Sequence, residues 1–175
     1  MFRTITLSAA AALMSLSGAA LAHDGPHVTD PQIAHIAYTA GQLDVTAGQQ
    51  ALAKSKNAAV RAFAEEMVRD HAAVNDKALA LVKKLGVTPE ANDTSAALTK
   101  QAGDTSAKLD KMSGAEFDKA YVANEVAYHK AVNTALKDML IPNAKNAELK
   151  ALLETGLVLF TEHQKHAEHL AAELH

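Results

Sequence analysis

The stretch AVRAFAEEMVRDHAAVNDKALALVKKLGV, residues 59–87, decides the fold class. Its apolar and small residues, with one histidine among them, follow one another in alternating steps of four and three. They are Val60, Ala64, Met67, His71, Val74, Ala78, Leu81 and Leu85. This spacing is typical of an amphipathic helix that packs its seam into a bundle. Asn57 is suited to cap the start of this helix, and Gly86 is suited to end it.

Two further segments before the middle of the chain show helical spacing. The first predicts a helix that Thr29 caps, with Pro31 in its first turn, and that runs to about Lys54. The second, residues 94–112, has a weaker pattern around Gly103 and predicts a short helix after the connection at residues 87–93.

The second half of the chain predicts two more long helices. Ser113 and Glu116 have the spacing of a capping box, which would open a helix that Pro142 and Asn143 close. The last helix is expected from about Asn146 to the C-terminus. We therefore predict an all-α domain over residues 30–175, a ferritin-like up-down four-helix bundle with an additional short helix in the crossover.

Composition excludes several classes of function. The 175 residues include 17 Lys and Arg against 20 Asp and Glu, so no basic excess is available to attract nucleic acid. The chain has no cysteine, which excludes disulfides and thiolate ligands. Any metal ion must therefore be bound through nitrogen and oxygen atoms.

The first 22 residues resemble an export signal. One positive charge precedes an apolar run, and Ala20, Leu21 and Ala22 form the small-x-small pattern that a signal peptidase cleaves. We predict cleavage after Ala22, a flexible segment over residues 23–29, and a mature protein in the periplasm. No second long apolar run follows, so no transmembrane segment is expected after cleavage.

Three predicted helices each carry a histidine in the middle of an apolar seam: His71, His129 and His163. A buried imidazole is costly unless it is hydrogen-bonded or bound to a metal. Histidine and carboxylate ligands without thiolates suit copper, zinc or iron. The sequence leaves two interpretations open, a transition-metal site or a metal-free hydrogen-bonded network.

Counting residues from the loops suggests which side chains lie at the same level. Asp44 should face His71 across the first helical hairpin. His163 should lie level with Glu125, with His129 offset by roughly one and a half turns. Glu125 and His129 are nevertheless one turn apart on the same face of their helix. The candidate metal ligands are therefore His71, His163 and one or both of Glu125 and His129. Asp44 is either a fourth ligand or a hydrogen-bond acceptor behind the ligands.

Other polar residues are secondary candidates. His166 follows His163 by three residues and is added to the candidate ligands. Asp70, Tyr121 and Tyr128 are candidates for orienting the ligands from behind, although ordinary packing also accounts for the tyrosines. Glu65 and Glu66 are expected on a solvated face.

The sequence contains none of the enzyme motifs for which we searched. The chain contains no Glu-x-x-His, so the paired motifs of a di-iron ferritin-like site are missing. It also contains no G-x-S-x-G, P-loop, dinucleotide-binding fingerprint or HExxH. We assign no catalytic residue.

Three blocks of sequence resemble domain-of-unknown-function family 4142, an exported bacterial family with a ferritin-like bundle and often the label predicted outer-membrane protein. They are residues 59–87, SGAEFDKAYVANEVAYHKAV at 113–132, and LFTEHQKHAEHL at 159–170. The resemblance implies that the acid of the first helix is Asp44, an Asp where Glu is usual in the family. It likewise places the family's Asp-His pair on Asp70 and His71, and its later histidines on His129 and His163.

These observations support two functions. One is a periplasmic protein that stores, buffers or uses a transition metal in its core. The other is a metal-free bundle that acts in envelope stress or binds a protein partner, with a structural or pH-responsive histidine network. Pairing into a homodimer, the identity of a partner and peripheral association with the outer membrane stay open.

Overall fold

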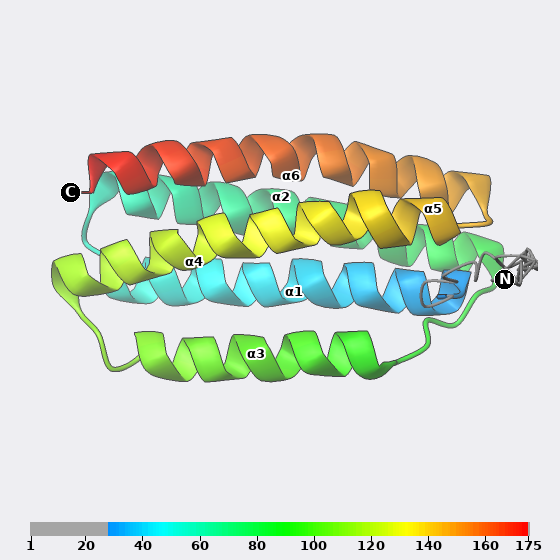
Figure 1. Ribbon diagram of the computed structural model, residues 1–175, viewed down its shortest axis with the longest axis horizontal. Coiled ribbons are helices and arrows are strands. Elements are labelled where there is room, and N and C mark those ends of the chain that lie inside the picture. The colour runs from blue at the N-terminus through cyan, green and yellow to red at the C-terminus, as the bar shows by residue number, and fades with distance from the viewer. Residues whose placement is uncertain (1–27, 175) are drawn as a thin grey trace, which may run out of the picture.

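The computed structural model describes residues 28–174, and these residues form an all-α bundle without strands (Figure 1). The predicted signal at residues 1–22 and most of the predicted flexible segment at 23–29 lie outside the described residues. The prediction of an all-α helical bundle is confirmed.

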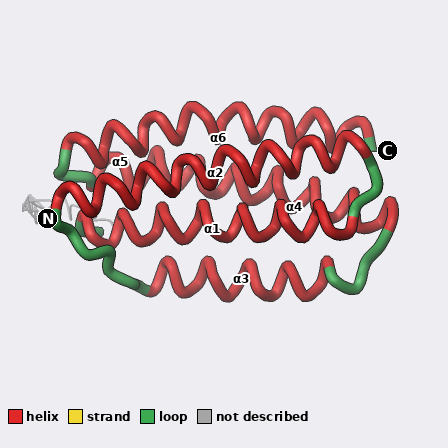
Figure 2. Tube along the Cα trace, turned by 180° about the vertical axis from the view of Figure 1, so that it is seen from behind, coloured by secondary structure: helices red, strands yellow, loops and turns green. Residues whose placement is uncertain are grey.

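Four long helices run up and down side by side, and a shorter helix flanks them (Figures 1 and 2). The elements are α1 (Asp30–Lys54), α2 (Ala58–Leu85), α3 (Asp93–Leu109), α4 (Gly114–Ala135), a π-helical turn (Leu136–Leu140), α5 (Ile141–Asn143) and α6 (Ala147–Glu173). The third helix lies in the crossover from α2 to α4 and runs along the outer side of α1, as both views show.

Asparagine side chains begin three of the helices. Asn57 Oδ1 accepts the backbone N–H of Ala59 at 2.9 Å, and Asn146 Oδ1 accepts that of Glu148 at the same distance. Asn92 caps α3 in the same way through the Ser95 N–H. These bonds satisfy donors that have no partner within the helix.

The boundary at Ser113 is where the sequence predicts it, but its capping box is not formed. Ser113 is the residue before α4, and its side chain makes no capping hydrogen bond. The reason is the next residue, Gly114, whose φ of 56° is a left-handed conformation that favours glycine. We attribute the missing bond to this turn of the backbone, which redirects the first N–H groups of the helix.

Two helix ends also differ from the prediction. The third helix ends at Leu109 rather than Met112, in a tight turn that continues to Lys111. The helix that Pro142 and Asn143 close contains a π-helical turn, in which the Ile141 N–H donates to the Leu136 carbonyl. The turn directly precedes Pro142, which has no N–H to donate, and sequence periodicity does not signal it.

A buried polar layer divides the core into two apolar clusters. One cluster packs Phe63, Met67, Phe117 and Tyr121 near the end where α6 finishes. The other packs residues at the opposite end; they include Ile33, Ile36, Leu136, Leu140, Leu149 and Leu153. Each of the four long helices has buried polar residues between these two clusters. They are Asp44 on α1, His71 on α2, Glu125 and His129 on α4, and His163 on α6.

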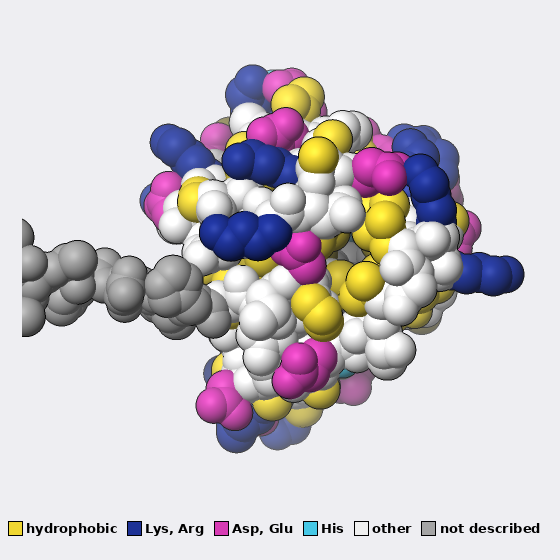
Figure 3. All heavy atoms as spheres, turned by 90° about the vertical axis from the view of Figure 1, so that its right-hand side faces the viewer, with side chains coloured by type: hydrophobic (Ala, Val, Ile, Leu, Met, Phe, Trp, Pro, Cys, Tyr) yellow, Lys and Arg dark blue, Asp and Glu magenta, His cyan; other side chains and the backbone are white. Residues whose placement is uncertain are grey.

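The surface of the described residues carries mixed charge. At the end of the bundle where α1 begins, Lys and Arg side chains alternate with Asp and Glu side chains (Figure 3). Within the described residues, no helix has both the length and the apolar character needed to cross a membrane.

Replacing either of two glycines by alanine should change the free energy of unfolding in opposite directions. A Cβ at Gly48 would lie 2.9 Å from Val68 Cγ2 and 3.1 Å from the Ala64 carbonyl, whereas a Cβ at Gly103 would meet nothing within 4 Å. Gly103→Ala should raise the free energy of unfolding by about 1 kcal/mol, because alanine is the better helix former. Gly48→Ala should lower it by about 1–2 kcal/mol, because α1 and α2 must separate. Urea denaturation of both variants checks the pair, and equal effects would contradict the close contact of these helices.

A buried histidine and carboxylate cluster

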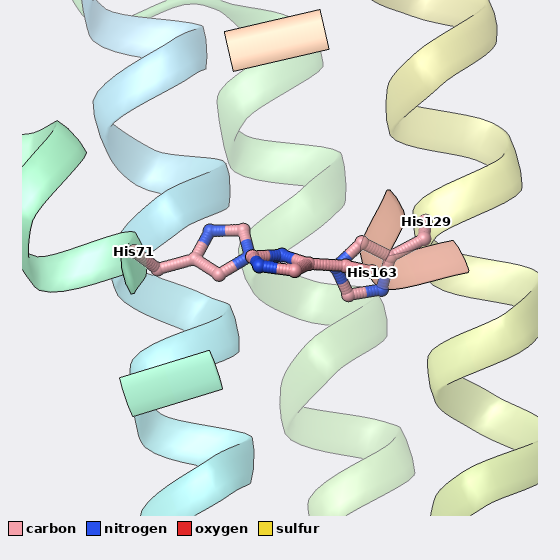
Figure 4. A group of neighbouring side chains, drawn as sticks. All are labelled: His71, His129 and His163. Atoms are coloured by element: carbon pink, nitrogen blue, oxygen red, sulfur yellow. The ribbon is translucent and has the colours of Figure 1, made fainter. Parts of the chain in front are cut away.

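Five polar side chains from four helices meet in the middle of the bundle. They are Asp44 from α1, His71 from α2, Glu125 and His129 from α4, and His163 from α6, and none is more than 3% exposed. The rings of the three histidines point toward one another (Figure 4). The prediction that three helices each place a histidine in the core is therefore confirmed.

Three ligand atoms form a small triangle at the centre of this cluster. His71 Nε2 lies 2.9 Å from Asp44 Oδ2, and His129 Nε2 lies 3.3 Å from the same oxygen. The two Nε2 atoms are 3.4 Å apart. The sequence prediction that Asp44 faces His71 is confirmed, and the shorter aspartate side chain reaches both imidazoles.

Hydrogen bonding fixes the tautomer of His129. Its Nδ1 lies 3.0 Å from the backbone carbonyl of Glu125, which only accepts, so Nδ1 carries the proton. Burial, with the nearby His71, lowers the pKa of His129 to about 4 despite the opposing attraction of Asp44. At neutral pH, His129 is therefore uncharged and presents the lone pair of Nε2 to the triangle.

His163 is held from behind by an acid at the rim of the bundle. Its Nε2 lies 3.1 Å from Asp70 Oδ2, and Arg69 donates two hydrogen bonds to the same carboxylate at 2.7 and 3.0 Å. Burial and the nearby His71 lower the pKa of His163. With Nε2–H donated to Asp70, the buried Nδ1 keeps its lone pair, the arrangement by which a carboxylate orients a metal-binding histidine. Asp70 thus contacts a histidine of a neighbouring helix, as expected for a residue that orients a ligand from behind.

The two carboxyl groups of the cluster have pKa values that are shifted in opposite directions. Burial alone would raise the pKa of Asp44, but its interactions with His71 and His129 hold that pKa below the ordinary value. Burial, with repulsion from Asp44, raises the pKa of Glu125 well above its ordinary value. Asp44 is therefore the carboxyl group of the cluster that loses its proton more readily, and Glu125 is the one that holds its proton more tightly.

Several polar atoms of the cluster have no hydrogen-bond partner among the described residues. They are Asp44 Oδ1 and Oδ2, Glu125 Oε2, His71 Nδ1 and His163 Nδ1. The Oδ2 atom of Asp44 lies close to two imidazole nitrogens but without the alignment of a hydrogen bond. Buried polar atoms are otherwise almost always paired, so this concentration of unpaired ligand atoms requires an explanation.

The axial offset expected between His129 and His163 does not keep their imidazoles apart. Their ring centroids are 5.5 Å apart, and both lie within one group of ligand atoms separated by no more than 4.8 Å. Helical side chains lean toward the N-terminus of their helix. In the antiparallel α4 and α6, this tilt moves the two imidazoles toward each other and closes the offset counted along the axes. Glu125 joins a second such group with Asp44 and His129.

The secondary candidates lie around the cluster rather than in it. Tyr128 donates to the Ala40 carbonyl at 2.8 Å and so ties α4 to α1, while the buried hydroxyl of Tyr121 has no partner among the described residues. His166 is 44% exposed and lies outside the central groups. Its Nδ1 is 2.7 Å from Glu66 Oε2, so Glu66 is paired and half-buried rather than fully solvated.

Asn75 is a buried polar residue that is not among the candidates predicted from the sequence. It lies one turn after His71 on α2, is 5% exposed, and its Nδ2 has no partner among the described residues. Its amide packs against Gly41, where a Cβ would collide with it. The signals available in the sequence were the four-residue spacing from His71 and a glycine within α1.

The fold and the cluster define a class of helical bundle with buried histidine and carboxylate side chains at mid-height. Within this class, the chain belongs to the family described as domain of unknown function (DUF4142), whose sequence profile matches residues 15–170. The resemblance noted in the sequence is confirmed. No curated protein and no solved structure matches the chain.

The depressed pKa values of the histidines predict a pH dependence. A histidine kept neutral in the fold stabilises it above pH 6.5 and less so as the pH falls toward the folded pKa, about 4 for His129. Glu125 has the opposite effect, because a carboxyl group with a raised pKa stabilises the fold at low pH. The variant Glu125→Gln removes this contribution, so that the remaining pH dependence reports the histidines. For this variant, freed of metal, the free energy of unfolding should fall by about 2 kcal/mol between about pH 7.5 and 5.

Urea denaturation at several pH values measures this loss. Adding His129→Gln in the Glu125→Gln background should flatten most of the dependence, because the main titrating group is then gone. A free energy of unfolding that does not change over this range in Glu125→Gln would contradict neutral, buried histidines.

Proposed function

We propose that this protein binds one transition-metal ion, copper, zinc or iron, at the triangle of His71 Nε2, His129 Nε2 and Asp44 Oδ2. The observation that carries the proposal is the spacing of these atoms, 2.9, 3.3 and 3.4 Å. Bonds of 2.0–2.1 Å in a tetrahedral site place two ligand atoms about 3.3 Å apart. Three ligands thus already have the separation that such an ion needs.

Further ligands are available next to the triangle. The unpaired Nδ1 of His163 is buried, and its ring is oriented by Asp70. Glu125 adds a carboxyl oxygen within 4.8 Å of ligand atoms on Asp44 and His129. Metal binding would deprotonate Glu125 if it became a ligand, which couples affinity to pH.

Electrostatics also favours a cation in this layer. Asp44 is a buried carboxylate with two oxygens that lack aligned donors, and His129 is neutral. A metal ion would neutralise this charge and satisfy the unpaired atoms together. We place this activity in the periplasm because of the predicted signal at residues 1–22, with storage, buffering or redox use of the ion as the role.

A metal-free histidine network is the second candidate. It is favoured by the contacts that hold the rings without an ion, namely the bond of His129 to the Glu125 carbonyl, the pair of His163 with Asp70, and the stacking of His71 on Phe160 at 4.4 Å. Such a bundle would act in envelope stress or in binding a protein partner. It differs from the first proposal in needing no ion for full stability.

Elemental analysis separates these two functions. Mature protein purified without a histidine tag and equilibrated with copper, zinc or iron should retain about one ion per chain after gel filtration. His71→Ala and His163→Ala should each lose that ion, whereas His169→Ala, at an exposed histidine of α6, should retain it. Circular dichroism checks that each variant is folded. Retention that is indifferent to His71 and His163 would exclude the core site.

Thermal unfolding gives an independent test of the same site. Zinc at about 100 times its dissociation constant should stabilise the wild-type protein by about 2.7 kcal/mol and raise its melting temperature. Asp44→Asn should abolish most of the rise, because it removes the shared oxygen of the triangle. His35→Ala, on the same helix but outside the cluster, is the control. An unchanged rise in Asp44→Asn would contradict the proposed ligand set.

A further inference from the structure

A large cavity lies beside the histidine and carboxylate cluster. Its volume is about 480 Å³, within the range of cavities that bind small organic molecules. All five main helices contribute to its lining, which follows α1 from Ala34 to Gln50. At 1.5 Å per helical residue this stretch is about 24 Å long, so the cavity is elongated along the bundle.

Most of this cavity is aliphatic. Between the cluster and the end where α1 begins, the walls are formed by small and branched apolar side chains. Among them are Ala37, Val74, Leu98, Val132, Leu136 and Leu153. An elongated apolar molecule would gain contact along the whole of this section.

Four of the polar side chains that line the cavity are buried and lie at the cluster. Asp44, His71 and Glu125 of the cluster line the cavity, and so does Asn75. The Nδ2 of Asn75 is a buried donor with no partner among the described residues, and Gly41 leaves room for its amide at this position. An oxygen acceptor on a ligand would satisfy this donor.

The helix that covers one side of the cavity is the most loosely packed of the long elements. Only Ser95 and Leu109 of α3 are buried, whereas Thr94, Leu98, Ala102 and Thr105 line the cavity. The third helix flanks α1 on the outside of the four-helix core (Figure 2). Few buried contacts make local opening easier here than elsewhere in the bundle, which gives a ligand a route inward.

We propose that this cavity binds a long-chain aliphatic alcohol, with the chain in the apolar section and the hydroxyl oxygen on Asn75 Nδ2. An uncharged head is required because the residues that line the cavity include no Lys or Arg to compensate a buried carboxylate. The ligand needs no metal ion, and the proposal stands apart from the metal site.

The test uses metal-free full-length mature protein and the apolar fluorophore N-phenyl-1-naphthylamine, with dodecanol, dodecanoate and dodecane as competitors. The fluorophore should bind the wild-type protein, and Ala37→Phe should weaken it by about tenfold or more because the new ring fills the cavity. Ala53→Phe, at an exposed position of the same helix, should leave it unchanged. Equal binding by these two variants would overturn the cavity as the binding site.

The head group is tested by competition. Dodecanol should displace the fluorophore at a concentration about tenfold lower than dodecanoate or dodecane, because only its hydroxyl satisfies Asn75 without adding charge. Asn75→Leu should remove this advantage while the fluorophore still binds. Dodecanoate competing better than dodecanol, or an advantage of dodecanol that survives in Asn75→Leu, would overturn the assigned head. Because metal is absent throughout, these outcomes do not depend on whether the core binds an ion.

Discussion

A single buried negative charge sets the requirements for the middle of this bundle. Asp44 is 1% exposed, and its oxygens lack aligned hydrogen-bond donors among the described residues. An uncompensated carboxylate in an apolar core costs several kcal/mol. The imidazoles of His71 and His129 lie close enough to lower its pKa, and the same charge helps to raise the pKa of Glu125 beside it. The placement of His71, His129 and Glu125 around Asp44 follows from the need to compensate this charge.

The four long helices surround this buried carboxylate, and an apolar cluster lies on either side of it along the bundle. The apolar clusters on either side exclude water, which strengthens electrostatic interactions within the layer. Gly48 lets α1 approach α2 closely, and Tyr128 ties α4 to the carbonyl of Ala40. At the rim, Arg69 and Asp70 orient His163 from solvent. Three residues of the layer, Asp44, His71 and Glu125, also line the large apolar cavity beside it.

Much of this arrangement was predictable from residue spacing. Periodicity identified the helices, and a histidine within each of three apolar seams identified the cluster, because helical spacing determines which side chains face the core. Counting along axes failed for His129 and His163, since it ignores the direction in which side chains lean. Gly114, the π-helical turn before Pro142 and the unpaired amide of Asn75 depend on local backbone geometry and on packing between helices. Spacing within one helix does not contain that information.

Diffraction from crystals of the mature protein grown with zinc, measured with anomalous scattering at the zinc edge, tests the central claim most directly. The account predicts one strong peak in the core of each chain, 2.0–2.2 Å from His71 Nε2, His129 Nε2 and Asp44 Oδ2. The Nδ1 of His163 or an oxygen of Glu125 should complete the ligand set. Peaks confined to exposed histidines such as His169, with an unchanged and metal-free polar layer, would contradict it.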